Sequence, residues 1–104
     1  MNTLGLVTIA AGGTPQALSS RSIGAVTVTL TPKPGNAAIV YYGTHGMVVA
    51  SGVNVAGAIP KPANATTGPF TPATLPPTTG VGGYRLENIY IDGTTGDGVY
   101  VEYV

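Results

Sequence analysis

The 104-residue chain contains no cysteine and no tryptophan, a single histidine and only eight charged side chains. Without cysteine it can form neither disulfide bonds nor thiolate metal sites. Four basic and four acidic residues give a formal net charge of zero. Nucleic-acid binding requires a concentrated positive surface, and anionic membranes attract positive charge. We therefore expect neither nucleic acid nor a membrane as a partner.

The sequence also lacks any stretch that approaches the roughly 20 apolar residues of a membrane-spanning helix. Residues 1–13 contain no basic side chain, since the first one is Arg21, and threonine interrupts their apolar run. This start is therefore interpreted as mature protein and not as a signal peptide. With 43% apolar residues and so few charges, we expect the chain to cover part of its surface by forming a homodimer or homotrimer.

Sixteen glycines and nine prolines are spread along the chain, and helices tolerate neither residue well. Short runs rich in β-branched and aromatic residues alternate with turn clusters, which is typical of a sandwich or barrel. We predict one all-β domain, residues 1–104, folded as a small antiparallel β-sandwich of jelly-roll type with seven or eight short strands. The predicted strands include residues 3–9, 16–19, 23–31, 37–42, 47–50, 53–58, 84–91 and 99–104.

Two predicted features carry most of this interpretation. In residues 23–31, Val26, Val28 and Leu30 alternate with threonines, which predicts one continuous strand with a single buried face. In residues 86–104, two β-type runs (86–91 and 99–104) flank a centre of glycine, threonine and aspartate, which predicts a β-hairpin. A second hairpin is predicted between residues 37–42 and 47–50, around a tight loop.

Residues 59–83 differ in composition, because they hold six of the nine prolines. A disordered linker is one interpretation. We favour a long extended loop within the domain, with an edge strand near residues 70–75 and with Phe70 and Leu75 as apolar anchors. Long loops in small domains are usually functional or ordered by a partner.

Candidate catalytic side chains are sparse. His45 has no sequence neighbour that would make it a general base or metal ligand, so we expect a polar residue at a loop tip. Asp92 and Asp97 could ligate Ca²⁺, but the regular alternate acids of a calcium loop are missing; turn hydrogen bonds are the favoured role. We expect no catalytic residue, no metal and no cofactor, and hence no enzyme.

The two glutamates are interpreted in the same way. Glu87 and Glu102 lie on predicted strands and are expected to act as surface or cross-strand partners of Arg85. The alternative, a glycosidase pair of carboxylates, is not favoured.

Six tyrosines are the largest aromatic group in the chain. Tyr41 and Tyr42 are adjacent and must face opposite sides of a strand, while Tyr100 must face away from Val99 and Val101. Exposed tyrosine is favoured at protein interfaces; a sugar-binding platform and ordinary packing in a sheet are the alternatives. The interface candidates are Phe70, Leu75, Tyr41, Tyr42 and Tyr100.

Three segments carry a resemblance to a known group of proteins: LVTIAAGGTPQALSS, AVTVTLTPKPGNAAIVYYG and LENIYIDGTTGDGVYVEYV. Together they resemble small structural proteins of tailed-bacteriophage head modules. The resemblance implies a jelly-roll-like virion protein of the decoration or cement type, made in the bacterial host cytoplasm. Its partner would be the major capsid protein on the outer surface of the capsid.

Two other functions remain open. A carbohydrate-binding or adhesive virion module would require two or more tyrosines on one exposed patch. A head–tail connector or tail component would form a ring of defined copy number instead of covering the shell.

Overall fold

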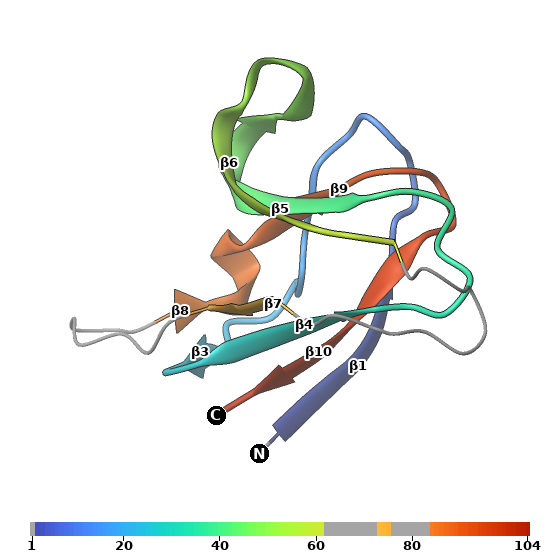
Figure 1. Cartoon of the computed structure of the whole chain (residues 1–104). Coiled ribbons are helices and arrows are strands. Elements are labelled where there is room, and N and C mark those ends of the chain that lie inside the picture. The colour runs from blue at the N-terminus through green and yellow to red at the C-terminus, as the bar shows by residue number, and fades with distance from the viewer. Residues whose placement is uncertain (1, 62–72, 76–83) are drawn as a thin grey trace.

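A computed structural model describes residues 2–61, 73–75 and 84–104 of the chain (Figure 1). Within these residues there are ten strands and two single-turn 3₁₀ helices, η1 (Val49–Ser51) and η2 (Leu86–Asn88). None of the described helices is long and apolar enough to cross a membrane. The strands are β1 (Asn2–Thr8), β2 (Gln16–Ala17), β3 (Gly24–Ala25), β4 (Val28–Pro32), β5 (Val40–Val48), β6 (Val53–Ile59), β7 (Ala73–Leu75), β8 (Tyr84–Arg85), β9 (Tyr90–Asp92) and β10 (Gly98–Tyr103).

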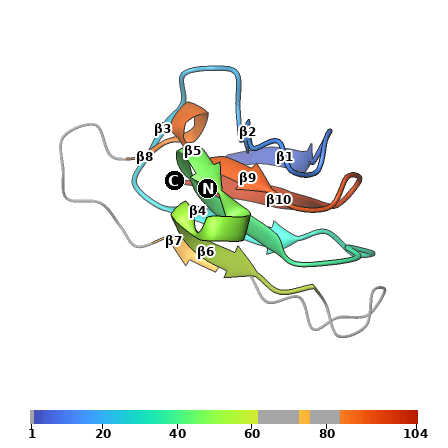
Figure 2. The same cartoon turned by 90° about the horizontal axis from the view of Figure 1, so that it is seen from above.

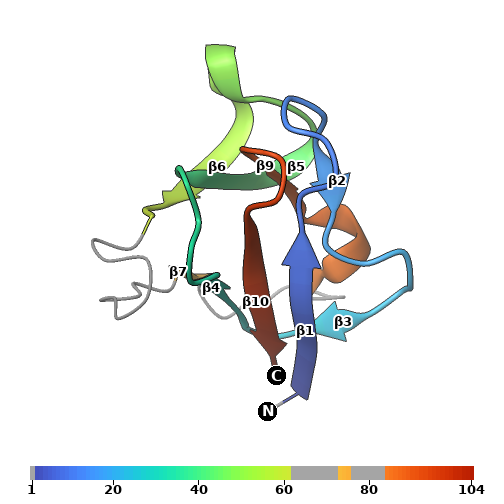
Figure 3. The same ribbon diagram turned by 90° about the vertical axis from the view of Figure 1, so that its right-hand side faces the viewer.

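The strands form two four-stranded sheets and one small two-stranded sheet. The first sheet has the order β1-β10-β4-β7, the second has the order β2-β9-β5-β6, and the small sheet pairs β3 with β8. Every pair is antiparallel. Figure 3 shows β1, β10 and β4 side by side, with β5, β6 and β9 in a separate layer. The prediction of a small antiparallel all-β fold is confirmed.

The pairing follows one simple rule. Each strand of the first half pairs with its counterpart in the second half: β1 with β10, β2 with β9, β3 with β8, β4 with β7 and β5 with β6. The chain is therefore one long antiparallel hairpin whose tip is η1, visible at the top of Figure 1. Contacts of β10 with β4 and of β5 with β9 wrap this hairpin into the two sheets, which is the jelly-roll arrangement.

The core lies between the two main sheets. Leu30 on β4 is the register partner of Val101 on β10, and Val28 and Val99 lie on the same face of the first sheet. All four side chains are fully buried. The alternation of side chains along each strand produces this face. The second sheet and the loops supply the rest of the cluster: Ile9, Leu18, Ala25, Val40, Ile59, Leu86, Ile89 and Ile91.

The predicted C-terminal hairpin is wrong. Strand β9 pairs with β2 and β5, whereas β10 pairs with β1 and β4, so the two strands belong to different sheets. Residues 93–97 are a crossover between the sheets and not a hairpin loop. The predicted strand over residues 84–91 is also divided, because η2 separates β8 from β9.

The predicted continuous strand over residues 23–31 is wrong as well, because it breaks into β3 and β4 at Val26 and Thr27. The C-terminal residue fills the break: Val26 N–H donates to the Val104 carbonyl at 2.6 Å, and Val104 N–H donates to the Thr27 carbonyl at 3.1 Å. Val26 is consequently 51% exposed, while Val28 and Leu30 are fully buried. Val26 therefore does not share their buried face.

The hairpin predicted between residues 37–42 and 47–50 is also wrong. Strand β5 runs without interruption from Val40 to Val48, turns at η1 and pairs with β6. The register shifts beside Gly43, where a Cβ atom would lie only 2.1 Å from the Asn54 carbonyl oxygen. A glycine that resembles a turn signal in sequence thus permits a close approach of two strands. Figure 2 shows β5 and β6 side by side from above.

The edge strand predicted near residues 70–75 corresponds to β7, which pairs with β4 at the end of the first sheet. Residues 62–72 and 76–83 lie outside the described residues. The rest of the predicted long loop, Phe70 included, is therefore not placed.

Candidate functional site

The two aspartates of the 92–97 segment fasten loops to one another. The carboxylate of Asp97 accepts hydrogen bonds from Ala37 N–H at 2.9 Å and from Ala38 N–H at 3.0 Å. Its neighbour Asn36 exchanges two hydrogen bonds of 2.9 Å with the backbone of Gly98. Asp97 and Asn36 are each only 5% exposed. These groups join the loop before β5 to the crossover before β10.

Asp92 has an equivalent role at the other end of the crossover. Its Oδ1 accepts hydrogen bonds from Gly13 N–H at 2.9 Å and from Gly93 N–H at 2.8 Å. The predicted turn hydrogen bond is thus present at the adjacent Gly93, and the second partner, Gly13, is distant in sequence. Over residues 2–61, 73–75 and 84–104, no group of three or more His, Asp and Glu side chains could hold a metal ion.

His45 lies within β5 and not at a loop tip, which corrects its predicted position. Its side chain is exposed, and its ring contacts the Tyr90 ring edge-on, with centroids 5.3 Å apart. Such an edge-to-face pair stabilises neighbouring strands.

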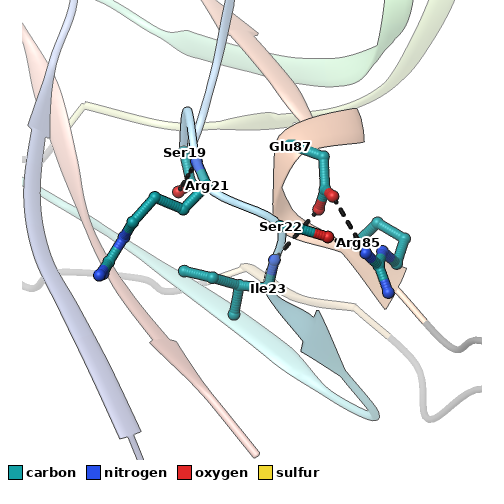
Figure 4. Close-up of polar contacts among 6 residues, drawn as sticks. All are labelled: Ser19, Arg21, Ser22, Ile23, Arg85 and Glu87. Atoms are coloured by element: carbon teal, nitrogen blue, oxygen red, sulfur yellow. Dashed lines mark hydrogen bonds and ion pairs between the residues drawn. The ribbon is translucent and has the colours of Figure 1, made fainter.

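Arg85 and Glu87 form an ion pair of 3.2 Å beside the small sheet (Figure 4). Glu87 also accepts a hydrogen bond from Ile23 N–H at 3.3 Å, and Arg85 donates one to the Ser22 hydroxyl. A hydrogen bond from its own backbone N–H is the largest cause of a pKa of Glu87 that is lowered from 4.5 to about 2. Desolvation opposes this effect, and hydrogen bonds from Ser22, Ile23 and Arg85 lower the pKa further. The cluster thus fastens the loop before β3 to η2. The predicted partnership of Glu87 with Arg85 is present; Arg21 in the same loop points away from it.

The outer face of the first sheet carries an apolar row. Leu6 on β1, Tyr100 on β10 and Thr31 on β4 are register neighbours across three strands. Leu6 is 43% exposed and Tyr100 is 40% exposed, whereas Val99 and Val101 are buried. The prediction that Tyr100 faces away from these valines is confirmed. We call Leu6, Tyr100 and Thr31 the Tyr100 row.

Sequence reasoning missed Leu6. Simple alternation places Leu4 and Leu6 on one face, but the register of β1 shifts between Thr3 and Gly5, where Gly5 has φ = +86°. As a result, Leu4 and Val7 both pack against the core while Leu6 faces outward. The glycine between two leucines is the signal of a bulge that could have found it.

The tyrosines Tyr41 and Tyr42 point to opposite sides of β5. Tyr42 packs against the core and lies over Gly57 of β6, its register neighbour. Tyr41 is half-buried and lies between two surface hollows of about 530 and 670 Å³, both also lined by Gly93. These hollows are bordered by exposed Val48 on one side and exposed Ile39 on the other.

A third hollow of about 290 Å³ lies where β5 and β6 meet β7, β8 and η2. We call it the Tyr42–Tyr84 groove, because it contains both tyrosines. Leu75, an interface candidate from sequence, lines this groove and also packs against the core. The described residues that line it are Tyr42, Gly43, Thr44, Ala56, Leu75, Tyr84, Arg85, Asn88 and Ile89.

Of the five interface candidates, the described structure brings Tyr42 and Leu75 together, at the Tyr42–Tyr84 groove. Tyr100 lies on the first sheet, Tyr41 lies on the other side of β5 from Tyr42, and Phe70 is outside the described residues. Comparison with known proteins found no matching family model, curated protein or solved structure. Functional inference therefore starts from the surfaces themselves.

Proposed function

We propose that the chain is a non-enzymatic structural protein of a tailed-phage virion that binds the outside of the capsid and stabilises it. The three segments that resemble head-module proteins support this proposal, together with the absence of net charge. The jelly-roll strand order is compatible with it, since capsid proteins and lectins both use this fold. Because a fold does not select a function, the proposal depends mainly on an exposed surface.

The observation that carries the proposal is the Tyr100 row. An exposed leucine and tyrosine lie side by side on the outer face of the first sheet, and threonine continues the row onto β4. Tyrosine supplies a large contact area with a polar end, which suits a protein interface that is apolar at its centre and wet at its rim. We assign this face to contact with the major capsid protein.

Binding through this face would stabilise the shell by mass action. A protein that binds only the assembled lattice lowers the free energy of that lattice relative to its separated subunits. Many copies that act together increase the total stabilisation, although no single contact is strong. A catalytic group is not needed for this role.

Self-association would use the free edge of β1, which is an end strand of the first sheet. The Gln16 side chain closes one part of this edge: its Nε2 donates to the Thr8 carbonyl at 3.0 Å, and its Oε1 accepts from Ala10 N–H at 2.8 Å. The remainder of β1, from Asn2 to Leu6, has no strand beside it on that edge within the described residues. An open edge can accept a strand from a neighbouring copy.

The test is co-sedimentation of the purified protein with expanded, empty phage capsids, after its mass in solution has been measured. We expect a dimer or trimer that pellets with capsids. A decoration role, in which many copies act together, predicts on the order of 100 or more copies per particle. Tyr100→Lys should weaken binding about tenfold or more, since it places an uncompensated charge in the contact. Val53→Lys, at an equally exposed apolar position in the second sheet, is the matched control and should bind normally.

Two results would contradict the proposal. The first is a monomer that does not pellet with capsids. The second is equal capsid binding by Tyr100→Lys and the native protein. About a dozen copies per particle at one vertex would support the connector alternative, since a ring has fixed stoichiometry. Phe70→Ala, tested in the same assay, examines the remaining anchor from the proline-rich segment.

A further inference from the structure

The Tyr42–Tyr84 groove has the location of a small-molecule site. Its walls come from four separate strands and η2, at the end of the sandwich where the β5–β6 hairpin meets β7 and the small sheet. Ligand sites occur often in the mouths of β-barrels and similar folds, and small sites start near roughly 300 Å³. A volume of about 290 Å³ therefore suits a ligand of one ring.

The interior of the groove is apolar and aromatic. Leu75 and buried Ile89 line it together with Tyr42 and Tyr84, both half-buried. Tyr42 lies over Gly57, its register neighbour on β6, where a Cβ atom would collide with the tyrosine ring. The ring therefore packs directly on the backbone of β6.

The rim of the groove supplies hydrogen-bonding groups without net charge. Thr44 and Asn88 are exposed and line the groove from β5 and from η2. Among the described residues that line the groove, Arg85 is the only charged one, and Glu87 neutralises it at 3.2 Å. An apolar interior with a neutral, hydrogen-bonding rim matches a ligand with an apolar face and several hydroxyl groups.

We propose that the Tyr42–Tyr84 groove binds a single neutral sugar ring. The aromatic and aliphatic wall would contact the C–H face of the ring, while Thr44 and Asn88 would hydrogen-bond to its hydroxyls. This site goes beyond the proposed capsid function and does not depend on it, because the groove and the Tyr100 row lie on different elements. A failure of one proposal would leave the other intact.

The experiment is an NMR titration of the full chain with glucose, galactose, mannose and N-acetylglucosamine. At least one sugar should cause saturable shifts of the Thr44, Ala56 and Asn88 amide signals, with a Kd on the order of 1 mM. Ala56→Phe should fill the groove from the exposed side of β6 and weaken this binding at least tenfold. Ala58→Phe, exposed on the same strand but outside the lining, is the matched control.

Asn88→Ala provides a second, milder test, since it removes a rim amide without filling the groove. It should weaken sugar binding several-fold at an unchanged unfolding midpoint. The proposal is overturned if none of the four sugars shifts these signals, or if Ala56→Phe and Ala58→Phe bind equally. Shifts caused by acetate but by no neutral sugar would also overturn it, because they would assign the groove to anion binding at Arg85.

Discussion

At the residue scale, acidic side chains hold the loops of this protein in place. Asp97 and Asp92 each accept hydrogen bonds from two backbone N–H groups. Three of these four groups belong to distant loops: Gly13 lies between β1 and β2, and Ala37 and Ala38 lie before β5. Hydrogen bonds to ionised groups contribute roughly 1.5–3 kcal/mol each, more than neutral pairs. With only eight charged residues, the chain places several of its carboxylates where the backbone needs acceptors.

Glu87 makes the stability of the protein sensitive to acid. Its pKa lies at about 2 in the folded chain and near 4.5 when unfolded, so the unfolded chain binds the proton first as the pH falls. The contribution of Glu87 is therefore complete above about pH 4.5 and is lost as the pH falls toward about 2. Glu87→Gln should remove this dependence. Urea unfolding midpoints at about pH 7 and about pH 3 should show a larger acid-induced loss in the native protein.

The other three acids are the same in both proteins, so the difference in acid-induced loss isolates Glu87. An equal loss of stability in native protein and Glu87→Gln would show that the contacts in Figure 4 do not stabilise the folded state.

At the element scale, the sequence allows the class of the fold to be predicted but not the partner of each strand. Alternation identifies Val28, Leu30, Val99 and Val101 as one-sided strand residues, and all four are buried. The turn residues of the 92–98 segment have the composition of a hairpin loop, yet their carboxylates bind Gly13, Ala37 and Ala38. Local composition predicts that the chain turns, but it does not predict with which distant strand the next strand will pair.

The candidate surfaces were predictable to a similar extent. The outward direction of Tyr100 follows from alternation. The exposure of Leu6 was not predicted, because the bulge at Gly5 reverses the face to which Leu6 points. The Tyr42–Tyr84 groove could not be found from sequence, since it unites residues of β5 and β6 with residues of β7, β8 and η2, which follow much later in the chain. Such a site exists only once the sheets have packed.

We expect Gly43 and Gly24 to differ in how well each tolerates substitution by alanine, because only Gly43 lies close to the backbone of another strand. A Cβ at Gly43 would lie 2.1 Å from the Asn54 carbonyl oxygen, which is backbone and cannot move aside. A Cβ at Gly24 would meet nothing nearer than 3.8 Å. We expect Gly43→Ala to lower the free energy of unfolding by about 1–3 kcal/mol or more. Gly24→Ala should change it by less than about 1 kcal/mol, in the stabilising direction.

Urea denaturation of the two variants under the same conditions measures both values. Equal effects would contradict the close approach of β5 and β6 at Gly43.

At the scale of the whole molecule, the nested pairing makes most contacts distant in sequence. Asn2 pairs with Tyr103, and Gln16 pairs with Ile91. Among the strand pairs of the described residues, only β5–β6 at the tip is local. Long loops must close before such pairs form, and proteins of this kind fold slowly. The order in which the pairs form is expected to run from the tip at η1 toward the two ends.

We therefore expect refolding in the range of milliseconds to seconds, typical of β-sandwiches. Stopped-flow fluorescence of the six tyrosines can follow it. Nine prolines add slower phases by isomerisation of the unfolded chain, and a double-jump experiment with a short unfolding time separates these phases. Refolding within microseconds would contradict the dominance of distant pairs.

The antiparallel pairing of β1 with β10 also determines how the protein responds to force. Asn2 and Tyr103 are register partners at one end of the first sheet, and Figure 3 shows the ends marked N and C side by side. A pull applied to these two residues loads the hydrogen bonds of the pair one after another, as in a zipper, and not all at once. Tension on the ends would therefore peel β1 away at low force, whereas compression across the two sheets would be resisted by the entire core.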